Sequence, residues 1–245
     1  MIIDLFSVDD APHNHVGGKG HNLHRLHKAG LPVPRAVAIR PHVNNVDELL
    51  AELEMIEWLR SGNNFAIRSS GVGEDSQDKS WAGIFDSYLF VEAHAVAHHV
   101  QKVVDSMEAS RYKKYAAESG AEINSMAVIV QEMIDADYAG VAFTTSPIEN
   151  DHRIALIEIV EGVGESLVSS QKTPATLRVN KVTNMARVQQ AGDDNIDESV
   201  LLEICDLLMP YLHKIEKLYD QPMDVEWAVH NNEIFILQAR PITTV

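Results

Sequence analysis

A predicted hairpin near the end of the chain carries a carboxylate, an amide and a guanidinium at regular spacing. Its segment, PMDVEWAVHNNEIFILQARPI at 222–242, reads as two strands of strong strand-forming residues around a polar turn. We predict that Glu226 pairs opposite Gln238, because this register makes one face of the hairpin wholly apolar and a one-residue slip would bury polar groups. The other face then presents four polar side chains in a row: Asp224, Glu226, Gln238 and Arg240. Two hard oxygen ligands suit Mg²⁺ and a guanidinium suits a phosphate oxygen, but a salt bridge on a solvated sheet face would look the same.

The same register predicts the remaining pairs of the hairpin. On the apolar face it sets Val225 opposite Ala239, Trp227 opposite Leu237 and Val229 opposite Phe235. To the polar face it adds Ala228 and Ile236.

Two further segments carry a cation beside glycines. HVGGKGHNL, at 15–23, places Lys19 in a glycine-rich entry to a helix, where the backbone can approach a phosphate and the helix N-terminus favours an anion. This is not the P-loop pattern, and a solvated lysine at a helix start is the alternative. FAIRSSGVGEDSQDKSWAG, at 65–83, places Arg68 at the end of a strand before a flexible loop, which fits a phosphate clamp under a lid. Two candidate phosphate donors follow, the backbone N–H of Gly83 and the hydroxyl of Ser87.

The elements that must position these residues are helices and strands mixed without strict alternation. The sequence predicts helices over 18–30, 46–61, 93–119 and 197–218. It predicts strands over 37–39, 64–70, 84–91, 126–134, 139–147, 153–162 and 175–181, before the closing hairpin. This pattern indicates an α+β or mixed α/β fold. A lobe boundary is expected near 130–136, where an apolar strand meets the polar DAD, and it divides the chain into lobes over 1–132 and 133–245.

The composition argues against several classes of protein. The 245 residues are 45% hydrophobic, enough for a sizeable core, and carry a formal net charge of −16. That charge disfavours non-specific binding to nucleic acid or to an anionic membrane, because the mean field repels phosphate. We see no membrane-spanning apolar run and no secretory signal, and a single cysteine permits no internal disulfide, so we expect a cytoplasmic protein. We interpret that cysteine, Cys205, as a small buried apolar residue of its helix.

Histidines recur on two of the predicted helices. His21, His24 and His27 follow the first helix, and His94 and His98 stand four residues apart on a later one. Such a pair can bind Zn²⁺, but no third ligand is evident, so we interpret both sets as solvated helix faces.

Five segments occur in the order in which one known family has them. They are GGKGHNLHRLHKAGLPVP, AIRSSGVGEDSQDKSWAGIFDSYL, VIVQEMIDADYAGVAFTTSP, EIVEGVGESLVSSQKTP and DVEWAVHNNEIFILQARPI. Together they cover nearly the whole chain, and they resemble the ATP-grasp nucleotide-binding domain of phosphoenolpyruvate synthase, pyruvate phosphate dikinase and rifampicin phosphotransferase. The resemblance implies an ATP-grasp fold of two lobes with a nucleotide cleft between them, and ATP and Mg²⁺ as cofactors.

The resemblance also assigns roles by position. The catalytic cations around the ATP phosphates would be Lys19, Arg68 and Arg240. The phosphate-facing loop would include Gly83 and Ser87. Near the adenine would lie Gln131, with backbone contacts from Glu132 and Met133. The metal and nucleotide ligands would be Glu226 and Gln238. Such a set suits phosphoryl transfer, which depends mainly on positioning and charge neutralisation.

The sequence departs from the family at several points. The segment 40–64 is shorter than usual, Thr145 and Ser146 replace an Arg–Asp pair, and Ala175 replaces an acidic residue. Family members also carry a swivelling domain with a phosphorylated histidine and a domain for the acceptor, and neither is recognisable here.

Three functions remain open at this point. The first is AMP-forming phosphotransfer from Mg-ATP to a histidine on a partner chain or on a missing domain. The second is a stand-alone small-molecule kinase or ATP-grasp ligase that forms ADP. The third is a non-catalytic ATP-binding module, against which the retention of all three cations argues. We expect no nucleic-acid and no membrane partner, and the acceptor is left unnamed.

Overall fold

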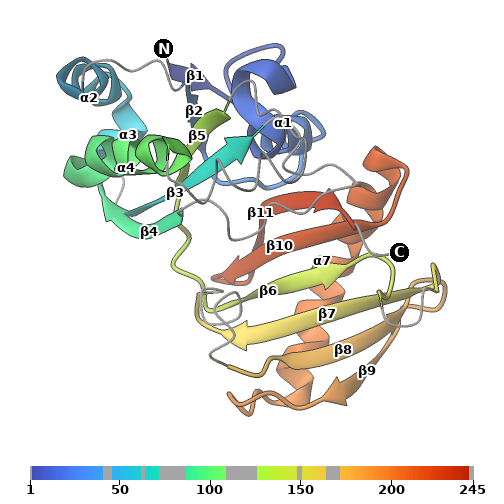
Figure 1. The fold of residues 1–245 in the computed structure, drawn as a ribbon. Helices are drawn as coiled ribbons and strands as arrows, with labels where there is room; N and C mark the ends of the chain where they lie inside the picture. The colour runs from blue at the N-terminus through green and yellow to red at the C-terminus, as the bar shows by residue number, and fades with distance from the viewer. Residues whose placement is uncertain are drawn as a thin grey trace. The chain divides into compact units, whose positions relative to one another are not determined.

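The computed structural model describes residues 2–40, 46–61, 64–71, 87–108, 126–147, 151–163 and 172–242. They divide into two compact units, the first formed by 1–28 with 34–133 and the second by 29–33 with 134–245. Each unit contains one sheet, and all described strand pairs are antiparallel (Figure 1). The predicted mixture of strands and helices is therefore confirmed.

The sheet of the first unit has five strands in the order β1-β2-β5-β3-β4. The strands are β1 (Ile2–Asp4), β2 (Ala36–Ile39), β3 (Asn64–Gly71), β4 (Ser87–Glu92) and β5 (Met126–Glu132). The helices are α1 (His13–Lys28), α2 (Val46–Glu54), α3 (Glu57–Ser61) and α4 (Val96–Glu108), with a 3-10 turn η1 (Ala93–Ala95) before α4.

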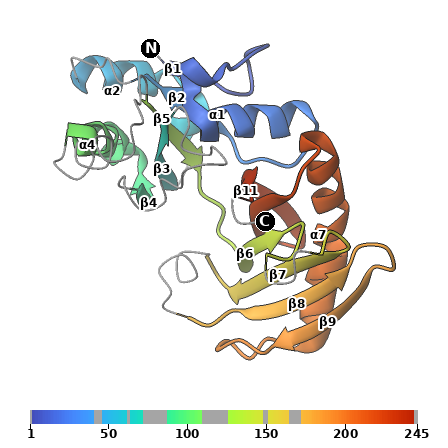
Figure 2. The ribbon, with the colours of Figure 1, turned by 45° about the vertical axis from the view of Figure 1, so that its right-hand side comes forward.

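One face of this sheet holds the apolar core of the first unit. Alternate residues of β3 and β5, Phe65 with Ile67 and Val128 with Val130, are buried in one cluster. The cluster is completed from α2, α3 and α4 by residues that include Leu53, Leu59, Val100 and Val103. These helices lie on the same side of the sheet (Figures 1 and 2).

Helix α1 covers part of the opposite face and approaches β3 very closely. The helix is kinked at Gly17, whose φ is 69°, and a Cβ there would overlap the carbonyl oxygen of Ser70. The Ser70 hydroxyl accepts a hydrogen bond from the Gly20 N–H (3.2 Å) and donates one to the Val16 carbonyl (2.7 Å). The backbones of α1 and β3 therefore meet at a position that requires glycine.

The sheet of the second unit has six strands in the order β11-β10-β6-β7-β8-β9. They are β6 (Tyr138–Phe143), β7 (Ile154–Glu161), β8 (Ala175–Asn180), β9 (Met185–Gln190), β10 (Met223–His230) and β11 (Glu233–Pro241). The long helix α7 (Glu198–Tyr219) runs along one face of this sheet (Figure 2). Its buried side chains recur at helical spacing: Leu201, Ile204, Cys205, Leu208, Leu212 and Ile215.

In the core of the second unit, the backbone at Gly140 lies in close contact with its neighbours. Trp227 is fully buried, and a Cβ at Gly140 would come within 2.8 Å of its ring and overlap the Glu158 carbonyl. Cys205 is 1% exposed, which confirms it as a buried apolar residue. Burial, helped by the charge of Asp206, raises the pKa of its thiol to about 11.

Several predicted boundaries differ from the observed ones. The helix predicted over 46–61 is two helices, because the N–H groups of Met55 and Ile56 bond carbonyls three residues back and tighten the chain. β1 and β9 were not predicted, since β1 has three residues and β9 is largely exposed and polar. Parts of the predicted helix over 93–119 and of the strand over 84–91 lie outside the described residues.

No helix in the described part of the chain is both long and apolar enough to cross a bilayer.

Candidate functional site

The closing hairpin brings its polar residues together as the sequence predicts. Glu226 of β10 pairs with Gln238 of β11, and Asp224 pairs with Arg240. Because directly opposed residues share a face, all four side chains lie on the face of the sheet opposite to that of Val225. Val225 itself is fully buried.

The register shifts by one residue directly beyond this row. Leu237 is the additional residue of a β-bulge, so Ile236 pairs with Trp227 and is buried on the core face rather than lying on the polar one. The hairpin pairs predicted beyond the bulge are therefore wrong. The observed pairs are Trp227 with Ile236 and Val229 with Ile234, in place of Trp227 with Leu237 and Val229 with Phe235.

Asp224 and Arg240 form an ion pair that fixes the guanidinium. The Arg240 Nε donates a hydrogen bond to Oδ2 of Asp224 at 2.9 Å, and Nη2 lies 2.8 Å from the same oxygen in an ion pair. The Asp224 side chain is only 12% exposed, and burial raises its pKa above the ordinary value. The charge of Arg240 opposes this shift, whereas the charge of Glu226 adds to it.

β7 contributes a carboxylate that the sequence reasoning did not select. Glu158 pairs with Val141 of β6, which in turn pairs with Glu226, so Glu158 and Glu226 lie in one cross-strand row. Burial raises the pKa of Glu158, and the charge of Asp224 raises it further. The signal was a single carboxylate in the middle of the apolar run IALIEIV, where a strand was expected.

The donors on this face suit a hard divalent cation whose remaining ligands come from water or from a bound phosphate. Glu226 and Gln238 offer a carboxylate and an amide oxygen on adjacent strands, and the carboxylates of Asp224 and Glu158 lie on the same face of the sheet. No cluster of three or more His, Cys, Asp or Glu side chains among the described residues is arranged to hold a metal ion alone. Mg²⁺ usually keeps water and phosphate oxygens as ligands, so a small protein donor set is compatible with it.

In the first unit, Arg68 and Gln131 lie on the sheet face that α1 partly covers. Arg68 follows the core residue Ile67 in β3, and Gln131 follows the core residue Val130 in β5, so both belong to the opposite face. Ser87, at the start of β4, pairs with Arg68 and shares its face. Gln131 is buried, Arg68 is half-buried and Ser87 is exposed.

Lys19 belongs to the helix packed on that same face. It lies two residues after the kink at Gly17 and is half-buried. The helix begins at His13, earlier than predicted, and the glycines mark a kink within it rather than its start. α1 packs against the sheet here, since a Cβ on Gly20 would meet the Ile129 side chain at 3.0 Å.

The segment after Gln131 uses its backbone N–H groups inside the first unit. The Glu132 N–H donates to the Arg35 carbonyl (2.9 Å), and the Met133 N–H donates to the Asn64 carbonyl (3.0 Å). A ligand that contacts this backbone would therefore use the carbonyl oxygens, each of which has two lone pairs. The Met133 sulfur accepts a hydrogen bond from the Phe90 N–H at 3.0 Å.

The predicted site residues thus fall into two groups. The first unit carries Lys19, Arg68, Ser87, Gln131, Glu132 and Met133, and the second carries Glu226, Gln238 and Arg240. Gly83 lies outside the described residues.

The histidines of α1 do not form a solvated face. His24 is 5% exposed, and its Nδ1 lies 2.7 Å from the Leu5 carbonyl oxygen. The His21 ring stacks on that of His13, with centroids 3.8 Å apart. These rings pack within the first unit, so the prediction of a purely solvated face is wrong.

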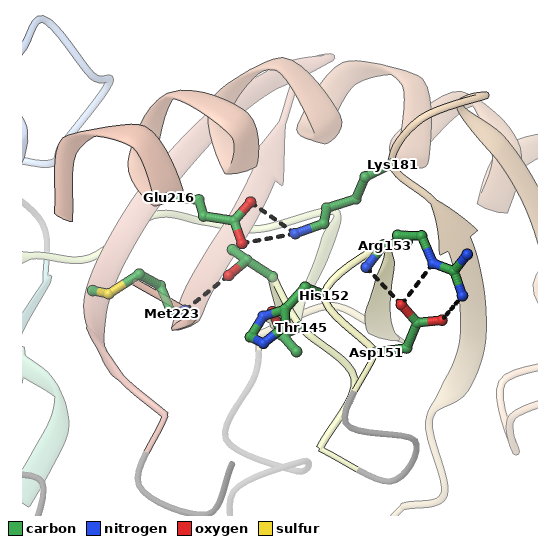
Figure 3. A network of polar contacts seen from close by, with 8 residues as sticks. Thr145, Asp151, His152, Arg153, Lys181, Glu216 and Met223 are labelled. Carbon is green, nitrogen blue, oxygen red and sulfur yellow. Dashed lines mark hydrogen bonds and ion pairs between the residues drawn. The ribbon is translucent and has the colours of Figure 1, made fainter. Parts of the chain in front are cut away.

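Thr145 and Ser146, which follow β6, are buried, and Thr145 belongs to a network of polar contacts (Figure 3). The Thr145 hydroxyl lies 3.4 Å from Nδ1 of His152, and Ser146 forms a β-bridge with Asp151. The Asp151 carboxylate accepts two hydrogen bonds from the Arg153 guanidinium, which hold its pKa at about 2. These contacts anchor the strand end. Nearby, Lys181 donates to both carboxylate oxygens of Glu216 on α7, at 2.7 and 2.8 Å (Figure 3).

Residues 42–245 match one protein family, described as the pyruvate phosphate dikinase AMP/ATP-binding domain. Lys19 precedes the matched region. Two of the relatives named below nevertheless align with the whole of this chain.

Three curated relatives illustrate the range of the family. A prodigiosin synthesizing transferase of Serratia marcescens is 30% identical over 100% of this chain. A probable phosphoenolpyruvate synthase of Methanocaldococcus jannaschii is 32% identical over 94%, and a rifampicin phosphotransferase of a Streptomyces species is 28% identical over 100%. The chain spans only 33%, 25% and 36% of these relatives.

A solved structure supports the fold. The dinucleotide-forming acetyl-coenzyme A synthetase 1 of Candidatus Korarchaeum cryptofilum superposes with a TM-score of 0.50 at 10% identity, over 91% of each chain. The chain therefore belongs to the family of pyruvate phosphate dikinase AMP/ATP-binding domains and has an ATP-grasp fold.

Proposed function

We propose that this protein binds Mg-ATP and passes a phosphoryl group from it to an acceptor. The observation that carries the proposal is the cross-strand row of the second unit, where Glu226 opposes Gln238 and Asp224 orients Arg240. A carboxylate, an amide oxygen and a fixed guanidinium on one sheet face match the needs of a metal–phosphate complex.

In this proposal, each site residue has a role in binding the nucleotide or its metal ion. Lys19, Arg68 and Arg240 neutralise phosphate charge, with Gly83 and Ser87 as further donors. Gln131 lies near the adenine, and the Glu132 and Met133 carbonyls accept from its exocyclic amine because their N–H groups are already bonded. Lobes over 1–132 and 133–245 remain our assignment. The two compact units support it, because the chain passes from the first to the second after Met133, although residues 29–33 belong to the second unit.

Glu226 and Gln238 would hold the Mg²⁺ ion. The ion would offset the negative charge of the carboxylates on this face, which adds to the effect of burial on the pKa values of Asp224 and Glu158, and it would shield the phosphates from those carboxylates. Asp224 would keep the Arg240 guanidinium oriented by its hydrogen bond and ion pair.

We propose a histidine as the acceptor, on a partner chain or on another part of the protein, with AMP as the nucleotide product. The chain spans between a quarter and about a third of the relatives described above, which supports the view that further domains take part. The use of ATP and the single cysteine support a cytoplasmic location.

A second candidate function is direct transfer to a small molecule, with ADP as the product. Its support is that one relative is named for a small-molecule acceptor, rifampicin. The nucleotide product separates the two functions. Chromatography after incubation with ATP would show AMP, together with phosphorylation of a histidine-bearing partner, if the first function is right. ADP formed with a small molecule and no partner would establish the second.

Substitution of Glu226 tests the metal assignment. Glu226→Gln keeps the size of the side chain but removes the anionic ligand, so we expect Mg²⁺-dependent ATP binding to weaken at least tenfold and turnover to be lost. The matched control is Glu233→Gln, an exposed glutamate of the same hairpin, which should bind as wild type does. Isothermal titration with and without Mg²⁺ measures both. Equal binding by the two variants would place the metal elsewhere.

Substitution of Arg68 tests the phosphate assignment in the first unit. Arg68→Ala should abolish turnover and leave the free energy of unfolding within about 1 kcal/mol of wild type, because Arg68 lies outside the apolar core cluster. Its effect should be larger for ATP than for adenosine, which has no phosphates to lose contact with. A variant that retains wild-type turnover would remove Arg68 from the site.

A further inference from the structure

Phe90 adopts a backbone conformation that its residue type disfavours. It lies in β4 with φ 56°, where the pairing with β3 is irregular: Val91 opposes Phe65 and Tyr88 opposes Ile67. The described part of the chain has five other non-glycine residues with positive φ, and all of them are Asn or Asp: Asn184, Asn195, Asp220, Asn231 and Asn232. Asn and Asp tolerate the left-handed region, whereas a bulky aromatic residue there is an outlier.

The side chain of Phe90 is not used in the core either. It is 46% exposed, and it is the one aromatic residue among the large exposed hydrophobic residues of the described chain. Its neighbour Val91, by contrast, is buried in the core cluster of the first unit. Neither backbone preference nor burial therefore accounts for phenylalanine at this position.

Phe90 contacts the residue that directly follows β5. Its N–H donates to the Met133 sulfur at 3.0 Å, although β3 lies between β4 and β5 in the sheet. The adjacent cross-strand row runs from Val91 through Phe65 to Glu132. Phe90 is thus in direct contact with the segment 131–133, where the proposed function places the base of the nucleotide.

We propose that Phe90 is a base-binding residue, whose exposed ring packs against the planar purine of the bound nucleotide. Its N–H also orients the flexible Met133 side chain, which gives the base a second apolar surface. An exposed aromatic ring offers stacking area that every base can use, so this contact adds affinity for the nucleoside part of the ligand and none for its phosphates. The local strain at φ 56° is then a feature of a binding site that the surrounding sheet maintains.

This inference rests on the proposed function, and one variant tests it by two opposite effects. Phe90→Asn supplies a residue suited to the left-handed region and removes the ring. We therefore expect the melting temperature to stay level or rise, while the affinity for Mg-ATP falls roughly tenfold, the loss typical of one base–aromatic contact. Binding of Mg-tripolyphosphate, which has no base, should be unchanged.

Two further variants sharpen the experiment. Phe90→Trp should keep Mg-ATP affinity within about twofold of wild type, because it retains an aromatic face. Met55→Ala, at the most exposed apolar side chain in the same unit, is the matched control and should alter neither affinity. Titration calorimetry measures binding and differential scanning calorimetry measures the melting temperature.

The possible results distinguish a failure of this inference from a failure of the proposed function. If wild type binds Mg-ATP and Phe90→Asn binds it equally well, Phe90 does not contact the base and the inference is overturned. The same holds if Phe90→Asn weakens tripolyphosphate and ATP alike, since the effect is then not on the base. If wild type binds neither ligand at millimolar concentration, the proposed function itself fails, and the inference fails with it.

Discussion

The two units of this protein position their charged residues in different ways. In the second unit, strand pairing alone places them. The pairing of β10 with β11 places Asp224, Glu226, Gln238 and Arg240, and the pairing of β7 with β6 places Glu158. In the first unit, register places Arg68 and Gln131, but Lys19 depends on the close approach of a kinked helix to β3. One arrangement rests on side-chain alternation and the other on a glycine contact.

The two units also contain ionisable side chains whose pKa values shift in opposite directions. In the second unit, burial raises the pKa values of Asp224 and Glu158, and neighbouring carboxylates raise them further. On α1 of the first unit, burial lowers the pKa values of His13 and His27, and neighbouring cationic groups add to the shift. The uncharged form is therefore favoured in both units, as a carboxylic acid in the second and as a neutral imidazole in the first.

The largest effect should come from the glycine contact in the first unit. Gly17→Ala places a Cβ onto the Ser70 carbonyl at a residue with φ 69°, so clash and backbone strain add. We expect a loss of about 4 kcal/mol in the free energy of unfolding, enough to unfold the unit under many conditions. Chemical denaturation followed by circular dichroism measures the loss.

Gly162→Ala in the second unit is the matched control. Gly162 has φ 78°, and nothing lies within 4 Å of a Cβ built there, so only backbone strain remains. Its expected cost is about 1 kcal/mol. Equal costs for the two alanines would show that α1 can move away from β3, and the contrast between the units would then be lost.

The next effect concerns the ion pair of the second unit. Arg240→Ala leaves the Asp224 carboxylate, 12% exposed, without this hydrogen bond and ion pair, so we expect a loss of about 2 kcal/mol in the free energy of unfolding. The double variant with Asp224→Asn should recover part of the loss, because no unpaired charge then remains. A double-mutant cycle in urea measures the coupling. No coupling would mean that Arg240 is held by other contacts.

Part of the hairpin register could be predicted from the sequence and part could not. Alternation of apolar and polar residues was enough to pair Glu226 with Gln238, since a slip would have buried polar groups. The bulge at Leu237 was not predictable in this way, because residues 234–237 are all apolar and either register buries some of them. Glu158 was not predicted, because only the pairing of β7 with β6 and of β6 with β10 places it in one row with Glu226, although a carboxylate inside an apolar strand is itself a signal.

The first unit was predicted less completely for a different reason. A strand of three residues, β1, leaves almost no pattern in a sequence, and its pairing with β2 depends on contacts distant along the chain. The glycines around Lys19 were predicted to let the backbone approach a phosphate, and this stays a prediction. In the structure, Gly17 lets α1 approach the Ser70 backbone, which the local sequence could not reveal. The pattern of apolar and polar residues predicted most helices and strands. The contacts between segments distant along the chain could be known only from the folded structure.

The smallest expected effect is the pH dependence of the stability of each unit, which tests whether the pKa shifts in the two units have opposite signs. The pKa of Glu158 is raised above its ordinary value of 4.5, so the folded state binds its proton more tightly than the unfolded state does. Its contribution to stability is therefore greatest below pH 4.5 and is lost as the pH rises through the raised pKa. For His27 the pKa lies below the ordinary 6.5, so its contribution is present above pH 6.5 and is lost as the pH falls toward the lowered value.

Hydrogen exchange read separately in each unit would measure these opposite slopes. Between pH 7.5 and about 5.5, α1 should lose protection in wild type relative to His27→Gln, whose side chain does not titrate. Between about pH 6 and 4, β7 should gain protection in wild type relative to Glu158→Gln. Each difference should stay below about 1 kcal/mol, because solvent screens both groups in part. Saturating Mg²⁺ should flatten the slope at β7 and leave that at α1 unchanged, since a cation beside Glu158 lowers its pKa while α1 gains no ligand. A slope of the same sign in both units would mean that the pKa shifts do not have opposite signs in solution. A Mg²⁺ effect at α1 alone would reverse the assignment of cation and anion sites.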